Sequence, residues 1–333
     1  MSNIARILVT GAGGFIGLHL VKRLRAEGHW VRGADLKYPE FAPTDANEFE
    51  ILDLRHFEHC LLAARGEIDQ VYNLAADMGG IGFITAKHAE IARNNILINA
   101  HMLEASRVQG VKRYLFSSSA CVYAQSKQKS AHVTPLREED AYPADPEPGY
   151  GWEKLYTEQL CHYYLQDYGF ETRIVRFHNV YGPLGTYEGG REKAPAAISR
   201  KVALAPNHGT IEIWGDGKQT RSFMYVDDCV EGLIRLMASG CREPLNLGTD
   251  RLISINGLVD LICSIAGKQL TKKHDLSQPQ GVRGRNSDNS RLREVLGWEP
   301  SIPLEQGLEV TYRWIEKELD AAGRIQKHAV STA

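Results

Sequence analysis

The chain has 333 residues, of which 43% are apolar and 24% charged, a soluble balance with material for one large or two medium-sized domains. Its formal charge of −2, without a long block of like charges, excludes a polyanion-binding tail, so neither nucleic acid nor a membrane is an expected partner. No apolar run is long enough to span a bilayer, and the first residues contain no apolar signal region. The six cysteines are scattered without a CxxC pair, which favours reduced thiols, a cytoplasmic location and no metal site.

The N-terminal segment predicts a βαβ unit. Residues 6–10 form a short β-branched run, residues 15–27 carry apolar side chains at helical spacing, and residues 30–35 form a second strand that ends in an acid. The alternation continues with strands at 71–76, 113–118 and 172–176 and helices at 95–109 and 153–168. This pattern is typical of an α/β protein with a Rossmann-type doubly wound parallel sheet, which binds ligands at the carboxyl ends of its strands.

The regularity weakens after residue 181, where glycine, proline, lysine and arginine become frequent. We therefore expect a Rossmann domain over residues 1–181 and a smaller C-terminal α/β substrate lobe formed mainly by residues 182–323. Apolar runs at 223–228 and 245–248 predict strands that return to the first domain. Residues 324–333 are expected to be a disordered tail.

The loop between the first strand and the first helix carries Gly11, Gly14 and Gly17 in the spacing GxxGxxG. Glycines at such a turn let backbone N–H groups approach a pyrophosphate, and the following helix N-terminus favours negative charge. Asp35 ends the second strand, where a carboxylate suits a ribose diol and repels a 2′-phosphate. The sequence therefore favours NAD over NADP, with nearby Lys37 as the opposing feature.

Tyr150 and Lys154 are four residues apart in a predicted helix, so they share one helix face. A nearby ammonium lowers the pKa of a tyrosine, which makes the phenol a usable acid and base for interconverting an alcohol and a ketone. A hydroxyl from Ser117, Ser118 or Ser119 at a strand end can hold the reacting oxygen. This spacing alone is more often a solvated surface pair, but the upstream glycine loop favours the catalytic interpretation.

Over nearly its whole length the chain resembles the extended short-chain dehydrogenase/reductase superfamily. The resemblance implies that NAD is the cofactor, that Tyr150 and Lys154 are catalytic, and that the C-terminal lobe binds a nucleoside-diphosphate sugar. The cofactor-binding residues expected from the motifs and from this resemblance are Gly11, Gly14, Phe15, Ile16, Gly17, Asp35, Asp53, Leu74, Ala75, Ala76, Tyr150 and Lys154.

A cysteine and a lysine narrow the reaction further. Oxidation at carbon 4 of a sugar acidifies the hydrogens on carbons 3 and 5, and inverting those centres needs one group that removes a proton and another that delivers one. A thiol and an amine fit this task if their pKa values are depressed. Cys121 follows the serine-rich strand end, and Lys193 lies at the start of the smaller lobe. A plain alternative remains for each, since Cys121 can be a buried apolar group and Lys193 a phosphate ligand.

Longer segments resemble the GDP-mannose 3,5-epimerase family, namely residues 76–83, 118–121, 177–183, 189–197, 214–223 and 281–288. The resemblance implies that GDP-mannose is converted to GDP-L-galactose and GDP-L-gulose by a homodimer, with Cys121 and Lys193 as the acid/base pair and Ser119 in the catalytic group. The implied substrate contacts are Gly79, Gly80, Ser119, Ala120, Cys121, Asn179, Glu192, Lys193, Ala194, Lys201, Gln219, Thr220, Arg221 and Arg283.

Two other functions stay open at this point. A 4-epimerase or 4,6-dehydratase of the same fold acts on another nucleotide sugar, and a 4-epimerase needs no second base. A non-enzymatic NAD-binding sensor needs neither Tyr150 nor Lys154, although both are present.

Overall fold

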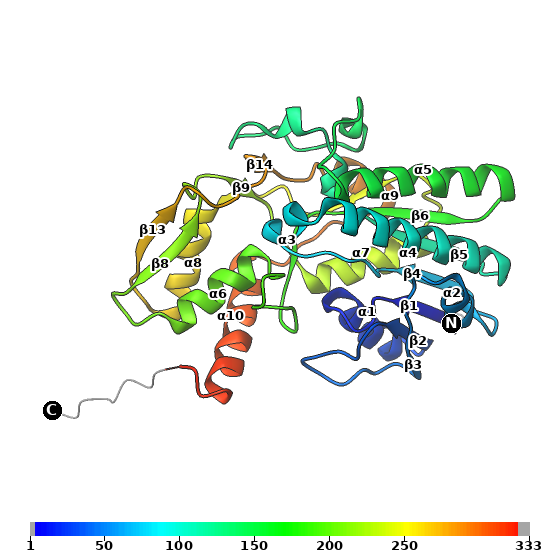
Figure 1. The fold of residues 1–333 in the computed structure, drawn as a ribbon, viewed down its shortest axis with the longest axis horizontal. Coiled ribbons are helices and arrows are strands. Elements are labelled where there is room, and N and C mark those ends of the chain that lie inside the picture. Colours follow the sequence, from blue (N-terminus) through cyan, green and yellow to red (C-terminus); the bar gives the residue numbers. More distant parts are fainter. Residues whose placement is uncertain (1–3, 326–333) are drawn as a thin grey trace.

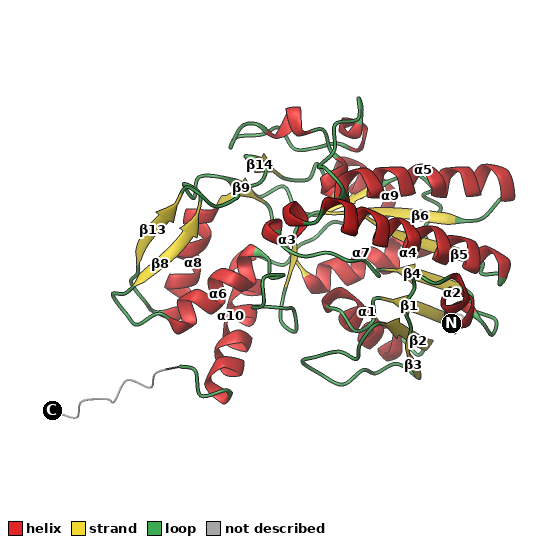
Figure 2. Ribbon diagram, viewed as in Figure 1, coloured by secondary structure: helices red, strands yellow, loops and turns green. Residues whose placement is uncertain are grey.

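The structure is a computed structural model that describes residues 4–325, so most of the expected disordered tail lies outside the described residues. Its centre is a seven-stranded sheet with the strand order β11-β6-β5-β4-β1-β2-β3, and every neighbouring pair is parallel (Figures 1 and 2). This confirms the predicted doubly wound α/β sheet. The strands of this sheet are β1 (Arg6–Thr10), β2 (Trp30–Asp35), β3 (Glu48–Ile51), β4 (Gln70–Asn73), β5 (Arg113–Ser119), β6 (Thr172–Phe177) and β11 (Leu245–Leu247).

Helices cover both faces of the sheet, because alternate residues of each strand point to opposite layers. Ile7 and Val9 of β1 pack in one core with α1 (Phe15–Ala26) and α7 (Val226–Ala238), whereas Leu8 packs in the other. The second core is closed by α2 (Phe57–Ala64), α4 (His88–Val108) and α5 (Tyr150–Tyr168). Helix α5 begins earlier than expected, so Tyr150 occupies its first turn.

The two predicted returning strands differ in outcome. Leu245–Leu247 pairs in parallel with β6 and forms the edge of the main sheet. From the run at 223–228 only β10 (Met224–Tyr225) is a strand, and it pairs with β7 (Val180–Tyr181) in a separate two-stranded sheet. Helix α7 begins directly after β10, where Asp227 and Asp228 in its first turn complement the helix dipole.

The C-terminal lobe packs against the α1–α7 side of the sheet. Helices α6 (Ala194–Leu204), α8 (Ile255–Ala266) and α10 (Leu304–Ala321) contact one another and contribute to the same core as α1 and α7. This lobe contains two small sheets. One consists of β8 (Thr210–Trp214) and β13 (Thr271–Asp275). The other has the strand order β12 (Ile253–Ser254), β9 (Thr220–Arg221), β14 (Gly284–Arg285). The short helices α3 (Ile81–Ala86) and α9 (Ser290–Leu296) complete the fold.

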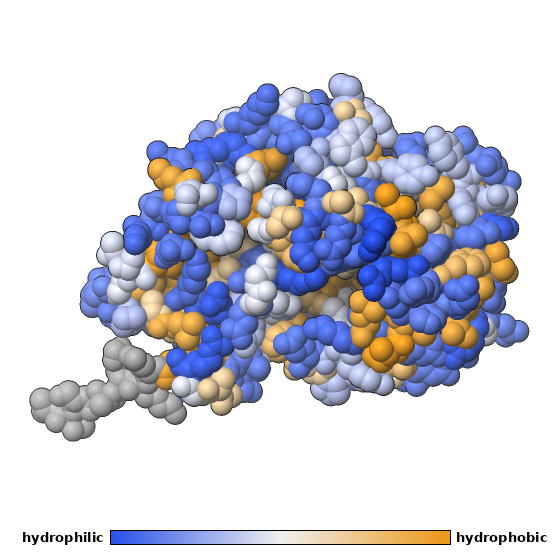
Figure 3. Space-filling view, in the orientation of Figure 1, coloured by the Kyte–Doolittle hydropathy of each residue, from blue (hydrophilic) through white to orange (hydrophobic). Residues whose placement is uncertain are grey.

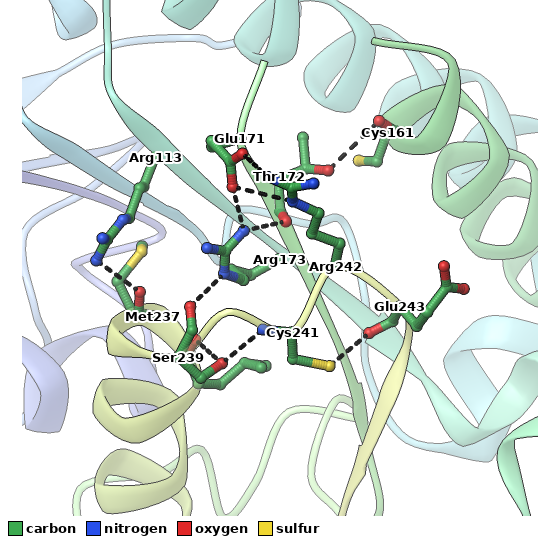
Figure 4. A network of polar contacts seen from close by, with 11 residues as sticks. Arg113, Cys161, Glu171, Thr172, Arg173, Met237, Ser239, Cys241, Arg242 and Glu243 are labelled. Carbon is green, nitrogen blue, oxygen red and sulfur yellow. Dashed lines mark hydrogen bonds and ion pairs between the residues drawn. The ribbon is translucent and has the colours of Figure 1, made fainter. Parts of the chain in front are cut away.

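A polar network fastens the amino ends of β5 and β6 (Figure 4). Arg173 donates to the Ser239 carbonyl at 3.0 Å and Arg113 to the Met237 carbonyl at 3.3 Å, which ties the last turn of α7 to the sheet. Glu171 accepts from both Arg173 and Arg242. These contacts lie at the strand ends opposite to the candidate site, so the carboxyl ends remain available for ligands.

Polar and charged side chains cover most of the molecular face in Figure 3, and apolar residues form only small groups there. Among the helices within residues 4–325, none is both long enough and apolar enough to cross a membrane.

Candidate active site

A cavity of about 1050 Å³ lies where the carboxyl ends of the central strands meet the C-terminal lobe. Every residue predicted to bind the cofactor lines it. Every residue predicted to bind the substrate lines it as well, except Thr220 and Arg283. The predicted cofactor residues and most of the predicted substrate residues therefore line one cavity.

The glycine loop forms one end of this cavity. Gly11 has a φ of +69°, and a Cβ on it would lie 2.8 Å from the Leu74 carbonyl carbon. A Cβ on Gly17 would lie 2.2 Å from the Gly11 oxygen. Gly14 is the residue before α1, so the helix N-terminus faces the cavity, with Phe15 and Ile16 in the wall. The loop thus presents backbone rather than side chains, as a bound pyrophosphate requires.

The Asp35 carboxylate lies against this loop. It accepts hydrogen bonds from the backbone N–H groups of Gly13 at 2.9 Å and Leu36 at 2.6 Å. Burial raises the pKa of Asp35, and these backbone donors oppose that effect. Lys37 also lines the cavity and forms an exposed ion pair with Glu40 at 3.0 Å. A carboxylate here fits the ribose diol of NAD.

Asp53 lines the same end of the cavity and forms an ion pair with Arg55 at 2.6 Å. Hydrogen bonds from Arg55 hold the Asp53 pKa at about 2, so the carboxylate is ionised at neutral pH. The segment that follows β4 completes the wall with Leu74, Ala75 and Ala76. The glycine cradle, the diol acceptor and this apolar segment together fit NAD.

The catalytic pair lies deeper in the cavity. Tyr150 and Lys154 are both buried on one face of α5, and the Lys154 ammonium is 5.5 Å from the centre of the Tyr150 ring. Burial raises the pKa of Tyr150 well above its usual value, and a side-chain hydrogen bond with Ser119 opposes this. Desolvation of the phenolate is the largest effect on the Tyr150 pKa, and the lowering of this pKa by Lys154 stays a prediction.

A buried carboxylate lies beside the Tyr150–Lys154 pair. Glu153 is fully buried, and its carboxylate lies 3.7 Å from the Lys154 ammonium. Asn95 and Asn99 of α4 donate to it at 2.9 and 3.1 Å. Burial lowers the pKa of Lys154, and the charge of Glu153 opposes that shift. No local sequence pattern predicts this support for Lys154.

The proposed acid/base residues both line the cavity. Cys121 lies in a short 3-10 helix (Ala120–Val122), and the Ser119 hydroxyl accepts from the Cys121 backbone N–H at 3.2 Å. Lys193 directly precedes α6 and is half-buried. Burial lowers the pKa of Lys193, and the charge of Cys121 acts against that shift.

The Cys121 thiol has neighbours that the sequence did not predict. The Arg285 guanidinium Nη1 lies 3.6 Å from the Cys121 sulfur, and Nη2 donates to the Glu147 carboxylate at 2.6 Å. Burial and the Glu147 charge raise the pKa of Cys121 to about 11, and the Arg285 charge acts in the opposite direction. Arg285 belongs to the same motif as the predicted Arg283, and only the fold distinguishes which arginine reaches the cavity.

Polar groups from the lobe form the other end of the cavity. Arg221 donates to the Thr220 carbonyl at 2.7 Å, and burial lowers its pKa to about 10. The buried Gln219 oxygen has no hydrogen-bond partner within the described residues, which leaves it free for a ligand. Lys201 donates to the Glu212 carbonyl at 2.9 Å. These donors and acceptors suit a polar, anionic ligand.

Two predicted substrate contacts, Thr220 and Arg283, do not line the cavity and are bonded to other groups of the protein. The Thr220 hydroxyl donates to the Ala131 carbonyl at 2.6 Å. Arg283 forms two hydrogen bonds with the Asp216 carboxylate, at 2.7 and 2.8 Å, in the wall of a smaller neighbouring cavity.

Comparisons with known proteins agree with this geometry. The chain is 49% identical over 317 residues to GDP-mannose 3,5-epimerase 1 of Oryza sativa subsp. japonica and to GDP-mannose 3,5-epimerase of Arabidopsis thaliana. These matches cover 95% of this chain and 82% and 83% of the two relatives.

Solved structures show the same fold. UDP-glucose 4-epimerase of Thermotoga maritima, bound to UDP-glucose, superposes with a TM-score of 0.84 and 30% identity, over 94% of this chain and 99% of that one. UDP-glucuronic acid 4-epimerase of Bacillus cereus, in complex with UDP-glucuronic acid and NAD, gives a TM-score of 0.80 and 28% identity over the same shares. The sequence pattern of one family matches residues 7–248, and the chain accordingly belongs to the NAD dependent epimerase/dehydratase family.

Proposed function

We propose that this protein catalyses the NAD-dependent epimerisation of GDP-mannose at carbons 3 and 5, giving GDP-L-galactose, with GDP-L-gulose from inversion at one carbon only. The observation that carries the proposal is that Cys121 and Lys193 line the same cavity as Tyr150. A 4-epimerase needs only the tyrosine, so a thiol and an amine at the same sugar site favour chemistry at neighbouring carbons. The similarity to the two plant enzymes supports the same substrate.

The reaction begins at the hydroxyl on carbon 4. Ser119 holds the reacting oxygen, and Tyr150 removes its proton. The glycine loop and Asp35 would hold NAD, which would supply a reversible hydride acceptor, so that no net cofactor would be consumed. Lys154, whose charged form Glu153 stabilises, favours the phenolate that this step needs. The product of the step is a ketone at carbon 4.

The ketone makes the hydrogens on carbons 3 and 5 acidic. One of the pair Cys121 and Lys193 removes a proton from one face of the sugar and leaves an enolate. The other group delivers a proton to the opposite face, which inverts the centre. The same two groups serve at both carbons, and Tyr150 returns its proton when the ketone is reduced again.

The lobe holds the nucleotide diphosphate in this scheme. Arg221 and Lys201 face the cavity and carry the positive charge that a diphosphate requires. The remaining proposed substrate contacts are Gly79, Gly80, Ala120, Asn179, Glu192, Ala194, Gln219, Thr220 and Arg283. Of these, Thr220 and Arg283 reach the ligand only if their side chains turn from their present partners.

A deuterium experiment tests the proposal. The NAD-loaded protein is incubated with GDP-mannose in heavy water, and the products are analysed by NMR. We expect deuterium at carbons 3 and 5 and products inverted at those centres. Cys121→Ala should lose most of this label, because one proton carrier is missing. The control Cys241→Ala removes a thiol outside the cavity and should keep the label.

Other outcomes identify another function. Inversion at carbon 4 without solvent label indicates a 4-epimerase, and loss of the carbon 6 oxygen indicates a 4,6-dehydratase. Unchanged labelling in Cys121→Ala rules out the role assigned to the thiol.

We also infer that the protein is a cytoplasmic homodimer with a boundary near residue 181 between its cofactor domain and its substrate lobe. Trp152, Tyr156 and Tyr163 on α5 are each about half exposed or more, with Ile96 on the neighbouring α4. Such an apolar face suits an interface in which two helices from each subunit pack together. The six unpaired thiols suit a reducing compartment.

A further inference from the structure

The Cys121 thiol contacts a buried cation that the reaction scheme above does not use. Arg285 is 6% exposed, lines the cavity, and approaches the sulfur to 3.6 Å. We propose that Arg285 stabilises the thiolate form of Cys121, and that its two partners, Gln128 and Glu147, tune this stabilisation in opposite directions. The proposal rests on the proposed function only in assigning proton transfer to the thiol.

Gln128 fixes the position of the guanidinium. Its side-chain oxygen accepts from Arg285 Nε at 2.5 Å, and its amide group donates to the carbonyls of Tyr123 and Ala124 at 3.1 and 3.3 Å. These carbonyls directly follow the Cys121 helix, so Gln128 locks Arg285 to the segment that carries the thiol. Gln128 is 1% exposed and does not line the large cavity. It therefore acts through Arg285 and is a positioning residue.

Glu147 holds the other side of the guanidinium. Its carboxylate accepts from Arg285 Nη2, and its backbone N–H donates to the Cys121 carbonyl at 3.0 Å. Unlike Gln128, it brings a negative charge close to the sulfur, and that charge raises the Cys121 pKa. Gln128 thus positions the Arg285 guanidinium without adding a charge, whereas Glu147 positions it and also disfavours the Cys121 thiolate.

The chemistry explains why this balance matters. When the thiolate removes a proton from carbon, an S–H bond forms, the C–H bond breaks, and the electron pair of that bond enters the enolate. In the delivering direction the S–H bond breaks, a C–H bond forms, and the thiolate remains. Arg285 keeps its own protons throughout and lowers the free energy of the thiolate in both directions, as an adjacent cation does.

A thiol titration tests the proposal in the NAD-loaded protein. The pH dependence of thiolate ultraviolet absorbance and of iodoacetamide labelling is measured for each variant, and the signal of Cys121→Ala is subtracted to isolate Cys121. Gln128→Leu releases the guanidinium, so the Cys121 titration midpoint should rise by about one pH unit. The labelling rate at neutral pH should then fall about tenfold, since the thiolate is the reacting form. Glu147→Gln keeps an acceptor for Arg285 and removes the negative charge, so the midpoint should fall.

A matched control separates this effect from general disturbance of the loop. Gln125→Leu makes the same chemical change in the same short helix, but Gln125 bonds to the Pro146 carbonyl rather than to Arg285. Its midpoint should stay at the wild-type value. If Gln128→Leu does not fold, as judged by circular dichroism, Glu147→Gln decides the question alone.

Contrary results are equally clear. An unchanged midpoint in a folded Gln128→Leu protein, or a rise in Glu147→Gln, overturns the proposal. Because the titration needs no substrate, it is independent of the deuterium experiment: opposite shifts without solvent label would retain the tuning of the thiol and reject the proposed epimerisation.

Discussion

The two ends of the cavity are built in different ways. The centre of the cofactor end is backbone from one contiguous loop, in which the glycines at 11, 14 and 17 let backbone atoms pack closely at the start of α1. The substrate end is made of side chains from segments that are distant in sequence, such as Cys121, Lys193, Arg221 and Arg285. The first depends on the lack of side chains in the glycine loop, and the second on polar and charged side chains that the fold brings together.

This difference decides how each end responds to change. An added methyl group at the cofactor end meets rigid backbone, whereas a changed side chain at the substrate end shifts charges and hydrogen bonds around its partners. Substitutions at the two ends should therefore separate binding from chemistry.

The largest effect is expected where the two ends meet, at Tyr150. Tyr150→Phe removes the phenol oxygen and keeps the ring, so we expect turnover of GDP-mannose to fall by about 10²–10⁴-fold. The NAD content of the purified protein should stay near the wild-type value. Product analysis and release of bound cofactor measure the two quantities. Activity near that of the wild type would remove Tyr150 from the mechanism.

The next effect tests the backbone character of the cofactor end. A Cβ at residue 17 lies 2.2 Å from the Gly11 oxygen, whereas one at residue 14 lies 3.2 Å from the same atom. Gly17→Ala should therefore cost about 1–3 kcal/mol of stability and weaken NAD binding strongly, because the loop must move. Gly14→Ala should have a clearly smaller effect. Thermal unfolding and NAD titration compare the two, and equal losses would contradict the close approach at Gly17.

The same difference explains what the sequence could predict. Strands β1 and β2 match their predicted bounds, and the cofactor residues around them all line the cavity, because local spacing determines backbone geometry there. Arg283 was an expected substrate contact, but its guanidinium pairs with Asp216, whereas Arg285 lines the cavity. Arg285 meets Glu147 only through tertiary folding, and no local pattern encodes that meeting.

The sequence also did not predict that the catalytic pair Tyr150 and Lys154 is removed from solvent. The spacing of Tyr150 and Lys154 predicts their contact, but not that both are almost fully buried. Burial is the largest effect on the Tyr150 pKa, and it raises that pKa. It also makes Lys154 depend on Glu153, whose carboxylate is fixed by two asparagines from α4. A buried charged group needs a partner, and the packing of the fold decides which partner it meets.

The smallest effect is expected at the ion pair that holds Arg283 in its present position. Hydrogen bonds from Arg283 lower the pKa of Asp216 to about 2, below its usual value of 3.8. A depressed acid stabilises the fold above its unfolded pKa, and this contribution disappears as the pH falls through about 2. Because the Asp216 side chain is 36% exposed, solvent screening limits the pair to about 0.2–1 kcal/mol.

Asp216→Asn should therefore lower the free energy of unfolding by that amount at neutral pH, and the difference from the wild type should vanish in strong acid. Urea unfolding at several pH values measures it, and a difference that grows as the pH falls would contradict the assignment. The same variant frees Arg283, so its KM for GDP-mannose distinguishes two roles. A lower KM in Asp216→Asn together with a higher KM in Arg283→Gln indicates that Arg283 turns toward the diphosphate, whereas unchanged KM values in both variants leave it as a surface ion pair.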